Sequence, residues 1–360
     1  MRSSSLKALA TLIAVAMMAA GCGKSADEGS SSGSSSGSAK SDKKVALVIA
    51  QGGLGDKSYN DLANSGFEKA VKETGVDGRA IESNDVVAQA EPILNRATKS
   101  GFGLVVDLDF SHADAIKKVA GANPDTRYAL INVPLEGANT TGVVFQEQEG
   151  SYLAGVLAAR MTTQSGNPRI NSEPIIGVIG GTKSTGIDKF LVGYIQGARD
   201  ADPKVKVLHA YANDFADPSK GKQIANSMFD RGADIVYHVA GGTGAGVIEA
   251  AKARNRYAIG VDTDQDGTAP GSVLTSMVKR TDLAVEQLVK DYADGSLKGG
   301  ENRTLGLKEN GVGLSEMKYT KKEVPDDVMA DVDKAKEGII DGSIKVWNVI
   351  DQGYPKYYKP

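Results

Sequence analysis

The sequence predicts an α/β protein built as two doubly wound parallel-sheet lobes around a hinged cleft. Short apolar runs that do not alternate with polar residues recur along the chain, and amphipathic helical segments separate them. Runs of this kind are typical of parallel strands that helices cover on both faces. The same order of elements starts again after the polar, proline-containing segment 164–174, which indicates two consecutive units of similar build.

The residues before this pattern are predicted to be a targeting signal followed by a flexible tether. A positively charged start is followed by an apolar run, 8–20, and then by small residues and Cys22. The run is too short to cross a bilayer as a mature helix. It therefore predicts a lipoprotein signal peptide at 1–21, with Cys22 as the lipidated residue, and an ordinary secretory signal is the alternative. Residues 22–42 are rich in Gly and Ser, as in a flexible spacer that holds a folded body away from a membrane.

The first series of elements begins near Lys43 and contains four predicted strands. Helical spacing of apolar residues predicts two helices, near 62–71 and 86–97, each ended by a glycine. The predicted strands are Val45–Ala50, Leu104–Leu108, Tyr128–Val133 and Thr141–Phe145.

The second series repeats this rhythm. Helices are predicted near 190–198, at Lys220–Arg231 and at Gly246–Arg254. The predicted strands are Ile175–Ile179, Val205–Ala210, Asp234–Val239, Tyr257–Val261 and Leu274–Val278.

Composition excludes several functional classes. The formal net charge of −3 provides no basic field for nucleic acid. A single cysteine excludes a disulfide scaffold and a multi-cysteine metal site, and the three histidines occur in no metal-ligand spacing. We therefore expect no metal and no cofactor.

The candidate ligand residues follow strands, because ligands of doubly wound sheets bind outside the carboxyl ends of the strands. In the first series these residues are Asp56, Tyr59, Asp109, Phe110 and Asn132. Ser58 with Asp61 three residues later is instead expected to cap the helix that follows.

The second series adds an aromatic residue, a glycine-rich loop and two charged residues. Phe215 suits stacking on a planar ligand, and the backbone at Gly242 and Gly244 can approach a ligand closely. Asp262 at a strand end can accept two hydroxyl hydrogen bonds, and Lys279 ends the next strand. The acidic run that starts at Asp262 resembles half of a calcium loop, but the position that needs Glu is valine.

Five motifs in this order carry a resemblance to a known family. The chain resembles the basic membrane protein family, whose best-known branch is the PnrA-like purine nucleoside receptor lipoproteins of bacterial ABC transporters. The resemblance runs from Lys43 to Lys345. Its motifs are Gly55–Asn60, Phe145–Ala159, Ile176–Gly181, Gly232–Ala251 and Ile259–Gln265.

The resemblance implies a type I periplasmic-binding-protein fold with a nucleoside between two lobes that three strands connect. It implies an N-terminal lobe of residues 43–147 with about 266–303, and a C-terminal lobe of 148–265 with about 304–360. The partners would be an ABC permease and its ATPase, and the protein would be held at the outer face of the cell membrane only by its lipid anchor.

The resemblance also implies roles for the candidate residues. The Asp56 loop would contact the base and Phe215 would stack on it, while Asp262 and Lys279 would hold the ribose hydroxyls beside the Gly242–Gly244 backbone. Asp109 and Asn132 are the candidates for a further polar contact in the first lobe. The family has an aromatic residue eight positions after Asp56, where this chain has Asn64. We expect either a one-sided stack or a replacement by Phe110 or Tyr59.

The chemistry leaves three alternatives to nucleoside transport. The same fold could hold a flavin or a sugar, the acidic run at Asp262 could serve a calcium-assisted nucleoside hydrolase, or the protein could be a surface adhesin or sensor. Because few side chains suit catalysis, the sequence favours a binding protein over an enzyme.

Overall fold

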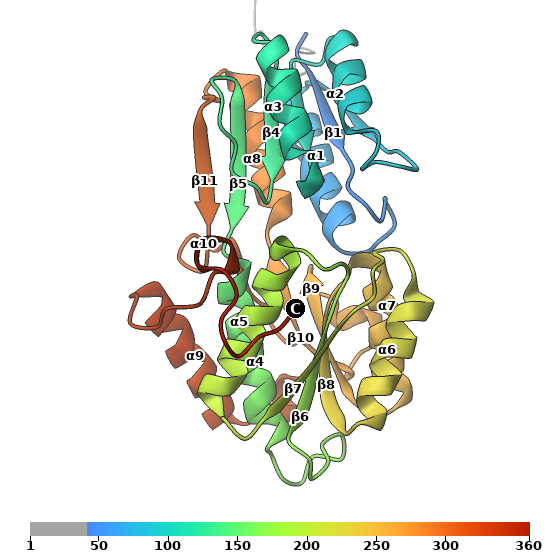
Figure 1. Ribbon diagram of the computed structural model, residues 1–360, viewed down its shortest axis with the longest axis vertical. Helices are drawn as coiled ribbons and strands as arrows, with labels where there is room; N and C mark the ends of the chain where they lie inside the picture. The colour runs from blue at the N-terminus through green and yellow to red at the C-terminus, as the bar shows by residue number, and fades with distance from the viewer. Residues whose placement is uncertain (1–41) are drawn as a thin grey trace, which may run out of the picture. The chain divides into compact units, whose positions relative to one another are not determined.

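Two six-stranded sheets form the framework of residues 42–360, which are the residues that the computed structural model describes (Figure 1). The predicted signal peptide, Cys22 and nearly all of the predicted tether lie outside the described residues. None of the helices in the described part is long and apolar enough to cross a membrane.

The first sheet has the strand order β11-β5-β4-β3-β1-β2, and all its neighbours are parallel. Its strands are β1 (Lys44–Val48), β2 (Asp77–Ile81), β3 (Leu104–Asp107), β4 (Arg127–Ile131), β5 (Thr140–Phe145) and β11 (Glu301–Leu305). Its helices are α1 (Tyr59–Thr74), α2 (Ala90–Lys99), α3 (Ala113–Ala122) and α8 (Thr281–Asp294).

The second sheet has the order β12-β10-β9-β8-β6-β7, parallel except for the β10–β12 pair. Its strands are β6 (Ile175–Gly180), β7 (Lys206–Tyr211), β8 (Ala233–Val239), β9 (Tyr257–Asp262), β10 (Val273–Lys279) and β12 (Val312–Leu314). Its helices are α4 (Glu147–Thr162), α5 (Thr185–Ala201), α6 (Pro218–Asp230), α7 (Gly244–Ala253), α9 (Asp326–Ile340) and α10 (Val349–Gln352).

Both faces of each sheet are covered, which explains the apolar runs without alternation. In β1, Val45 and Leu47 belong to the core cluster that contains Phe67 of α1, whereas Ala46 and Val48 belong to the cluster of α2 and α3. The second sheet is packed in the same way between α4 with α5 and α6 with α7. Successive side chains of a strand point to opposite faces, so a doubly covered strand is apolar throughout.

Two edge strands and one buried helix that the sequence did not predict lack such a pattern. The edge strands β2 and β11 have the sequences DGRAI and ENRTL, and most of their residues are partly or fully exposed. Helix α4 is the opposite case, because nearly all of its residues are buried and no polar face marks it as amphipathic.

Glycines let α4 and α5 approach closely. A Cβ atom at Gly155 would lie 2.1 Å from the carbonyl oxygen of Tyr194, and one at Gly197 would lie 2.1 Å from that of Tyr152. The two helices carry two charged residues of the site, Glu147 at the start of α4 and Lys189 in the second turn of α5.

The chain passes between the two sheets three times, after β5, after β10 and after β11. This order corrects the expected lobe boundaries. Residues 266–279 were expected in the first lobe, but β10 pairs with β9 in the second sheet, and the chain returns to the first only after Lys279. Residues 304–305 were expected in the second lobe, but they end β11 in the first sheet. Parallel pairing with a buried neighbour decides where each strand belongs, and the sequence contains no boundary signal there.

Candidate functional site

A cavity of about 430 Å³ lies where the carboxyl ends of strands from both sheets come together. The loops after β1, β3 and β4 supply its lining from the first sheet, and the ends of β8, β9 and β10 supply it from the second. The first turns of α5 and residue Ile350 of α10 complete the wall. This position is the one expected for ligands of doubly wound sheets.

Eight of the predicted site residues line this cavity and three do not. The lining residues among them are Asp56, Tyr59, Asp109, Phe110, Asn132, Phe215, Asp262 and Lys279. Asn64, Gly242 and Gly244 are not among the residues that line it.

These three residues make structural contacts instead of lining the cavity. Asn64 lies on α1, where its amide donates a hydrogen bond to Glu68 at 2.9 Å. Gly244 packs under His238, whose ring would lie 2.0 Å from a Cβ at this position. The Gly242 backbone lies beneath Phe215, because a Cβ there would be 3.2 Å from the Phe215 carbonyl oxygen. Within the glycine-rich loop, Gly242 and Gly244 thus permit close packing, whereas Gly241 lines the cavity.

Asp56, and not Ser58, caps helix α1. The Asp56 carboxylate accepts hydrogen bonds from the backbone N–H groups of Ser58 and Asn60 at 2.9 Å and of Asp61 at 3.2 Å. Ser58 makes no side-chain bond to the helix, which corrects the expected capping box. Burial raises the pKa of Asp56 above its usual value, although these N–H donors oppose the shift.

The Ser58 hydroxyl instead joins the two halves of the cavity. Its Oγ donates a 2.7 Å hydrogen bond to Oδ2 of Asp262, at the end of β9. Among the described residues, no donor reaches Oδ1 of Asp262. Asp262 has a left-handed backbone with φ +66°. Burial raises the pKa of this carboxyl group to about 6, although Lys279 and Ser58 favour its charged form.

Lys279 lies at the centre of a buried polar cluster. Its Nζ atom is 2.5 Å from Oδ1 of Asn132 and 2.8 Å from Oε1 of Glu147. The rings of Tyr59, Phe145 and Phe190 surround the ammonium group, with centroids 5.0–5.5 Å from Nζ.

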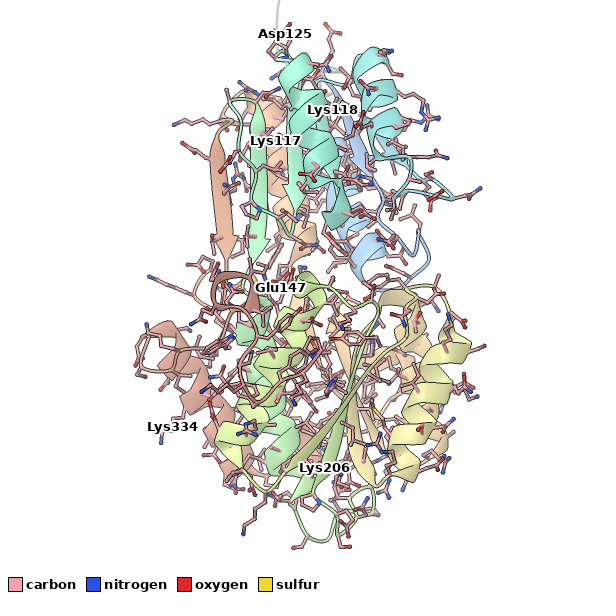
Figure 2. All side chains as sticks on the ribbon, in the orientation of Figure 1. Lys117, Lys118, Asp125, Glu147, Lys206 and Lys334 are labelled. Carbon is pink, nitrogen blue, oxygen red and sulfur yellow. The ribbon has the colours of Figure 1, made fainter. Side chains whose placement is uncertain are left out.

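Glu147 and Lys189 belong to this cluster, and the sequence reading missed both. Glu147 is the first residue of α4, where the chain leaves the first sheet (Figure 2). Its Oε2 atom lies 2.5 Å from Nζ of Lys189, which also donates to the carbonyl of Phe145 at 2.8 Å. Burial alone would raise the pKa of Glu147, but attraction to Lys189 and Lys279 outweighs burial and lowers it. The one sequence signal for this pair was that Glu147 lies within the motif Phe145–Ala159.

Tyr59 and Asp109 organise the first-sheet side of the cavity. The Tyr59 hydroxyl donates to the Leu108 carbonyl and accepts from Nδ2 of Asn132, both at 2.9 Å. Asp109 accepts from the backbone N–H of Gln51 at 3.1 Å and from Ser111. Both side chains thus hold loops and neighbouring residues in position.

Aromatic rings line other parts of the cavity wall. Phe215 is packed over Gly181, since a Cβ at that glycine would lie 2.2 Å from the Phe215 ring. Phe110 and Phe190 also line the cavity. Phe110 and Tyr59, the two residues expected to replace the aromatic that is absent at Asn64, both lie in the cavity wall.

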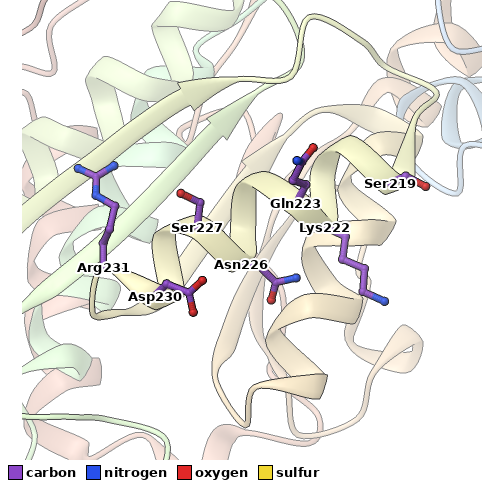
Figure 3. Close-up of a pocket in the computed structure, with 7 residues that line it drawn as sticks. All are labelled: Ser219, Lys222, Gln223, Asn226, Ser227, Asp230 and Arg231. Carbon is purple, nitrogen blue, oxygen red and sulfur yellow. The ribbon is translucent and has the colours of Figure 1, made fainter.

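Another hollow, of about 590 Å³, runs along the outer side of α6 (Figure 3). All its lining residues lie within 219–231, on α6 and at its end. A hollow beside a single helix cannot enclose a small molecule, so the cavity between the sheets remains the candidate site.

Comparison with known proteins agrees with this fold. Residues 43–348 match the family described as ABC transporter substrate-binding protein PnrA-like. The chain belongs to this family. It is 34% identical to the ABC transporter nucleoside-binding protein BmpA of Lactococcus lactis, over 93% of this chain and 96% of that protein. It is 35% identical to the CD4+ T-cell-stimulating antigen of Listeria monocytogenes, over 94% of this chain and 97% of that protein.

A solved structure of an ABC transporter solute-binding protein from Aeropyrum pernix superposes with a TM-score of 0.80 at 30% identity, covering 85% of this chain and 93% of that one. The fold predicted from the resemblance, a type I periplasmic-binding-protein fold, is thereby confirmed. Members of this family are substrate-binding proteins, so the chain binds and releases a ligand and is not an enzyme such as a nucleoside hydrolase.

Proposed function

We propose that the protein binds a nucleoside, with a purine base preferred, in the cavity between the two sheets and delivers it to an ABC permease. The observation that carries the proposal is the placement of Asp262 and Lys279 in one cavity with Phe215 and Phe110. The charged pair provides an acceptor and a donor for hydroxyl groups, and the rings provide surfaces for a planar base.

Asp262 is suited to the two hydroxyl groups of a ribose. Its Oδ1 atom accepts no hydrogen bond from the described residues, and Oδ2 accepts one from Ser58. A buried carboxylate with one unused oxygen gains from a hydroxyl donor and loses when the donor is missing. This asymmetry favours ligands with vicinal hydroxyl groups over ligands that lack them.

Lys279 is suited to hold the same sugar, because it lines the same cavity as Asp262. Its ammonium group is fixed by Asn132 and Glu147 and has three donors, of which those two residues use two. Asn132 and Glu147 hold the ammonium group in one place, which lowers the entropy that is lost when it binds a hydroxyl group.

The name of the Lactococcus lactis relative supports a nucleoside as the ligand. The sequence signal at 1–21 and Cys22 support export and lipid attachment at the outer face of the cell membrane. A lipid anchor followed by the spacer 22–42 would keep the binding body within reach of its permease and ATPase.

Titration calorimetry on the mature protein, refolded from denaturant to remove carried-over ligand, tests the proposal. The titrants are purine and pyrimidine ribonucleosides, their 2′-deoxy counterparts, free bases, flavins and sugars. We expect ribonucleosides to bind, purines more tightly than pyrimidines. Absence of heat with every nucleoside, or tight binding of a flavin or sugar alone, would refute it.

The variant Asp262→Asn tests the site separately from the function. It should weaken ribonucleoside binding by about tenfold or more and weaken 2′-deoxynucleoside binding less. Asp264→Asn is the matched control, because Asp264 lies on the same loop but is exposed and does not line the cavity. An unchanged dissociation constant for Asp262→Asn would remove this residue from the site.

A further inference from the structure

The chain's last segment, residues 347–360, runs along helix α5 toward the cavity and is called the C-terminal strap. At its start, the backbone N–H of Trp347 donates to Oε1 of Gln196 at 2.8 Å. Helix α10 follows, close to α5 in Figure 1. At its end, the strap reaches β7, where His209 donates to the Lys359 carbonyl at 3.1 Å.

Ile350 of the strap is part of the cavity wall. It lines the cavity together with Thr185, Gly186 and Ile187, which form the first turn of α5. The residue is 48% exposed, so it lies where the cavity opens to solvent and not in the interior. An apolar side chain in this position covers a ligand without providing a hydrogen bond.

A buried carboxylate anchors the strap to α5. Asp188, which is fully buried one turn into α5, accepts hydrogen bonds from the hydroxyls of Tyr354 at 2.7 Å and Tyr358 at 3.2 Å. Tyr211 of β7 is its third hydroxyl partner. Two of the three donors come from the strap, so detachment of the strap would leave a buried charge with a single partner.

Asp188 stands in α5 directly between Ile187 and Lys189, both of which line the cavity. The residue that anchors the strap is therefore bonded directly to two residues of the cavity wall. We propose that the Asp188–Tyr354–Tyr358 cluster positions Ile350 as a ligand-retaining residue, so that the strap sets how fast bound ligand leaves. This proposal rests on the proposed function, because it needs a ligand in this cavity.

The experiment is stopped-flow measurement of nucleoside release from the full mature protein, with an excess of unlabelled ligand as competitor. Ile350→Ala should raise the dissociation rate constant by about threefold or more and change the association rate constant less. The control is Ile340→Ala, which removes an isoleucine of α9 that is 41% exposed and lies outside the cavity.

A second pair of variants tests the anchor without touching the cavity wall. Tyr354→Phe removes one donor to Asp188 and should also speed release. Tyr357→Phe removes a neighbouring hydroxyl that has no hydrogen-bond partner among residues 42–360 and should leave the rate unchanged. Thermal unfolding of each variant identifies one that has lost its fold.

The outcomes separate the two proposals. If the wild-type protein binds no nucleoside, the proposed function fails and the strap proposal falls with it. If the wild-type protein binds a nucleoside but Ile350→Ala and Tyr354→Phe release it at the wild-type rate, only the strap proposal is overturned. Faster release from Tyr357→Phe as well would show that the effect does not pass through Asp188.

Discussion

Ser58 Oγ donates a 2.7 Å hydrogen bond to Asp262 Oδ2, and this bond joins the N-terminus of α1 in the first lobe to the end of β9 in the second. A second bond beside it, from Nε2 of Gln265 to the carbonyl of Lys57 at 3.2 Å, crosses the same boundary. The two lobes are thus connected at the site itself, through a carboxylate that is also the best candidate for binding the sugar.

Ser58→Ala should destabilise the protein because it leaves the buried Asp262 carboxylate without its hydroxyl donor. We expect the free energy of unfolding to fall by about 1–3 kcal/mol, measured by urea denaturation. Ser65→Ala is the control, since Ser65 is exposed and bonds only to the carbonyl of Leu62 in the same helix. Equal stability of the two variants would contradict an energetic role for the Ser58–Asp262 bond.

Ligand binding should strengthen as the pH rises through about 6. Burial raises the pKa of Asp262 from 3.8 to about 6, so the folded protein holds this proton more tightly than the unfolded chain. The buried carboxylate therefore destabilises the folded state increasingly as the pH rises from 3.8 to about 6. Hydroxyl donors from a ligand offset that cost only when the carboxylate is ionised.

Thermal shift measurements with and without ribonucleoside test this pH dependence. The ligand-induced rise in Tm should be larger at about pH 7.5 than at about pH 5. Asp234 and Asp266 also have pKa values raised to about 6 by burial, but they do not line the cavity and act equally with and without ligand. The same pH dependence in Asp262→Asn would contradict the assignment.

Glu147→Gln should be strongly destabilising, because it leaves the buried ammonium groups of Lys189 and Lys279 without their shared carboxylate. Breaking a buried ion pair by removing one partner costs about 3–5 kcal/mol. Glu249→Gln removes one partner of the exposed pair with Lys222 and should change stability by less than about 1 kcal/mol. Chemical denaturation compares them, and similar losses would show that the cluster adds nothing beyond a surface pair.

Phe215→Ala should weaken nucleoside binding by about 1–3 kcal/mol, which is the usual cost of losing one base–aromatic stack. Asn64→Ala should leave the dissociation constant unchanged, because Asn64 does not line the cavity. Calorimetry on both variants decides between the two positions. A loss of affinity in Asn64→Ala would restore this residue to the site.

Nucleoside 5′-monophosphates should bind about tenfold or more weakly than the nucleosides. The cavity is lined by four carboxyl groups, those of Asp56, Asp109, Glu147 and Asp262, and by the two ammonium groups of Lys189 and Lys279. A phosphate adds negative charge to a site that already has an excess of acidic groups. Competition titration measures the ratio, and equal affinities would show that the phosphate stays outside the cavity.

Much of the fold and part of the candidate site could be predicted from the sequence. Doubly covered strands are apolar on both faces, so the strands around Val45–Val48 and Tyr257–Asp262 are visible in the chain itself. Residues placed directly after such strands, including Asp262, Lys279 and Phe215, fall in the cavity because parallel strands end at one edge of the sheet.

Other features depended on contacts between distant segments. Residues 266–279 were predicted to lie in the wrong lobe because pairing between β9 and β10 decides that choice. Ser58 was expected to cap α1, but the neighbouring Asp56 takes the N–H donors and leaves the hydroxyl to Asp262.

The sequence by itself determined the two α/β series, the strand ends that carry polar residues and the family to which the chain belongs. Only the tertiary structure decided that Glu147 and Lys189 join Lys279 in one buried cluster, and that Ile350 reaches the cavity from the end of the chain. The reason is physical. Hydrophobic periodicity is a local property that each segment carries alone, whereas a buried charge is stabilised only by partners that folding brings from elsewhere in the chain.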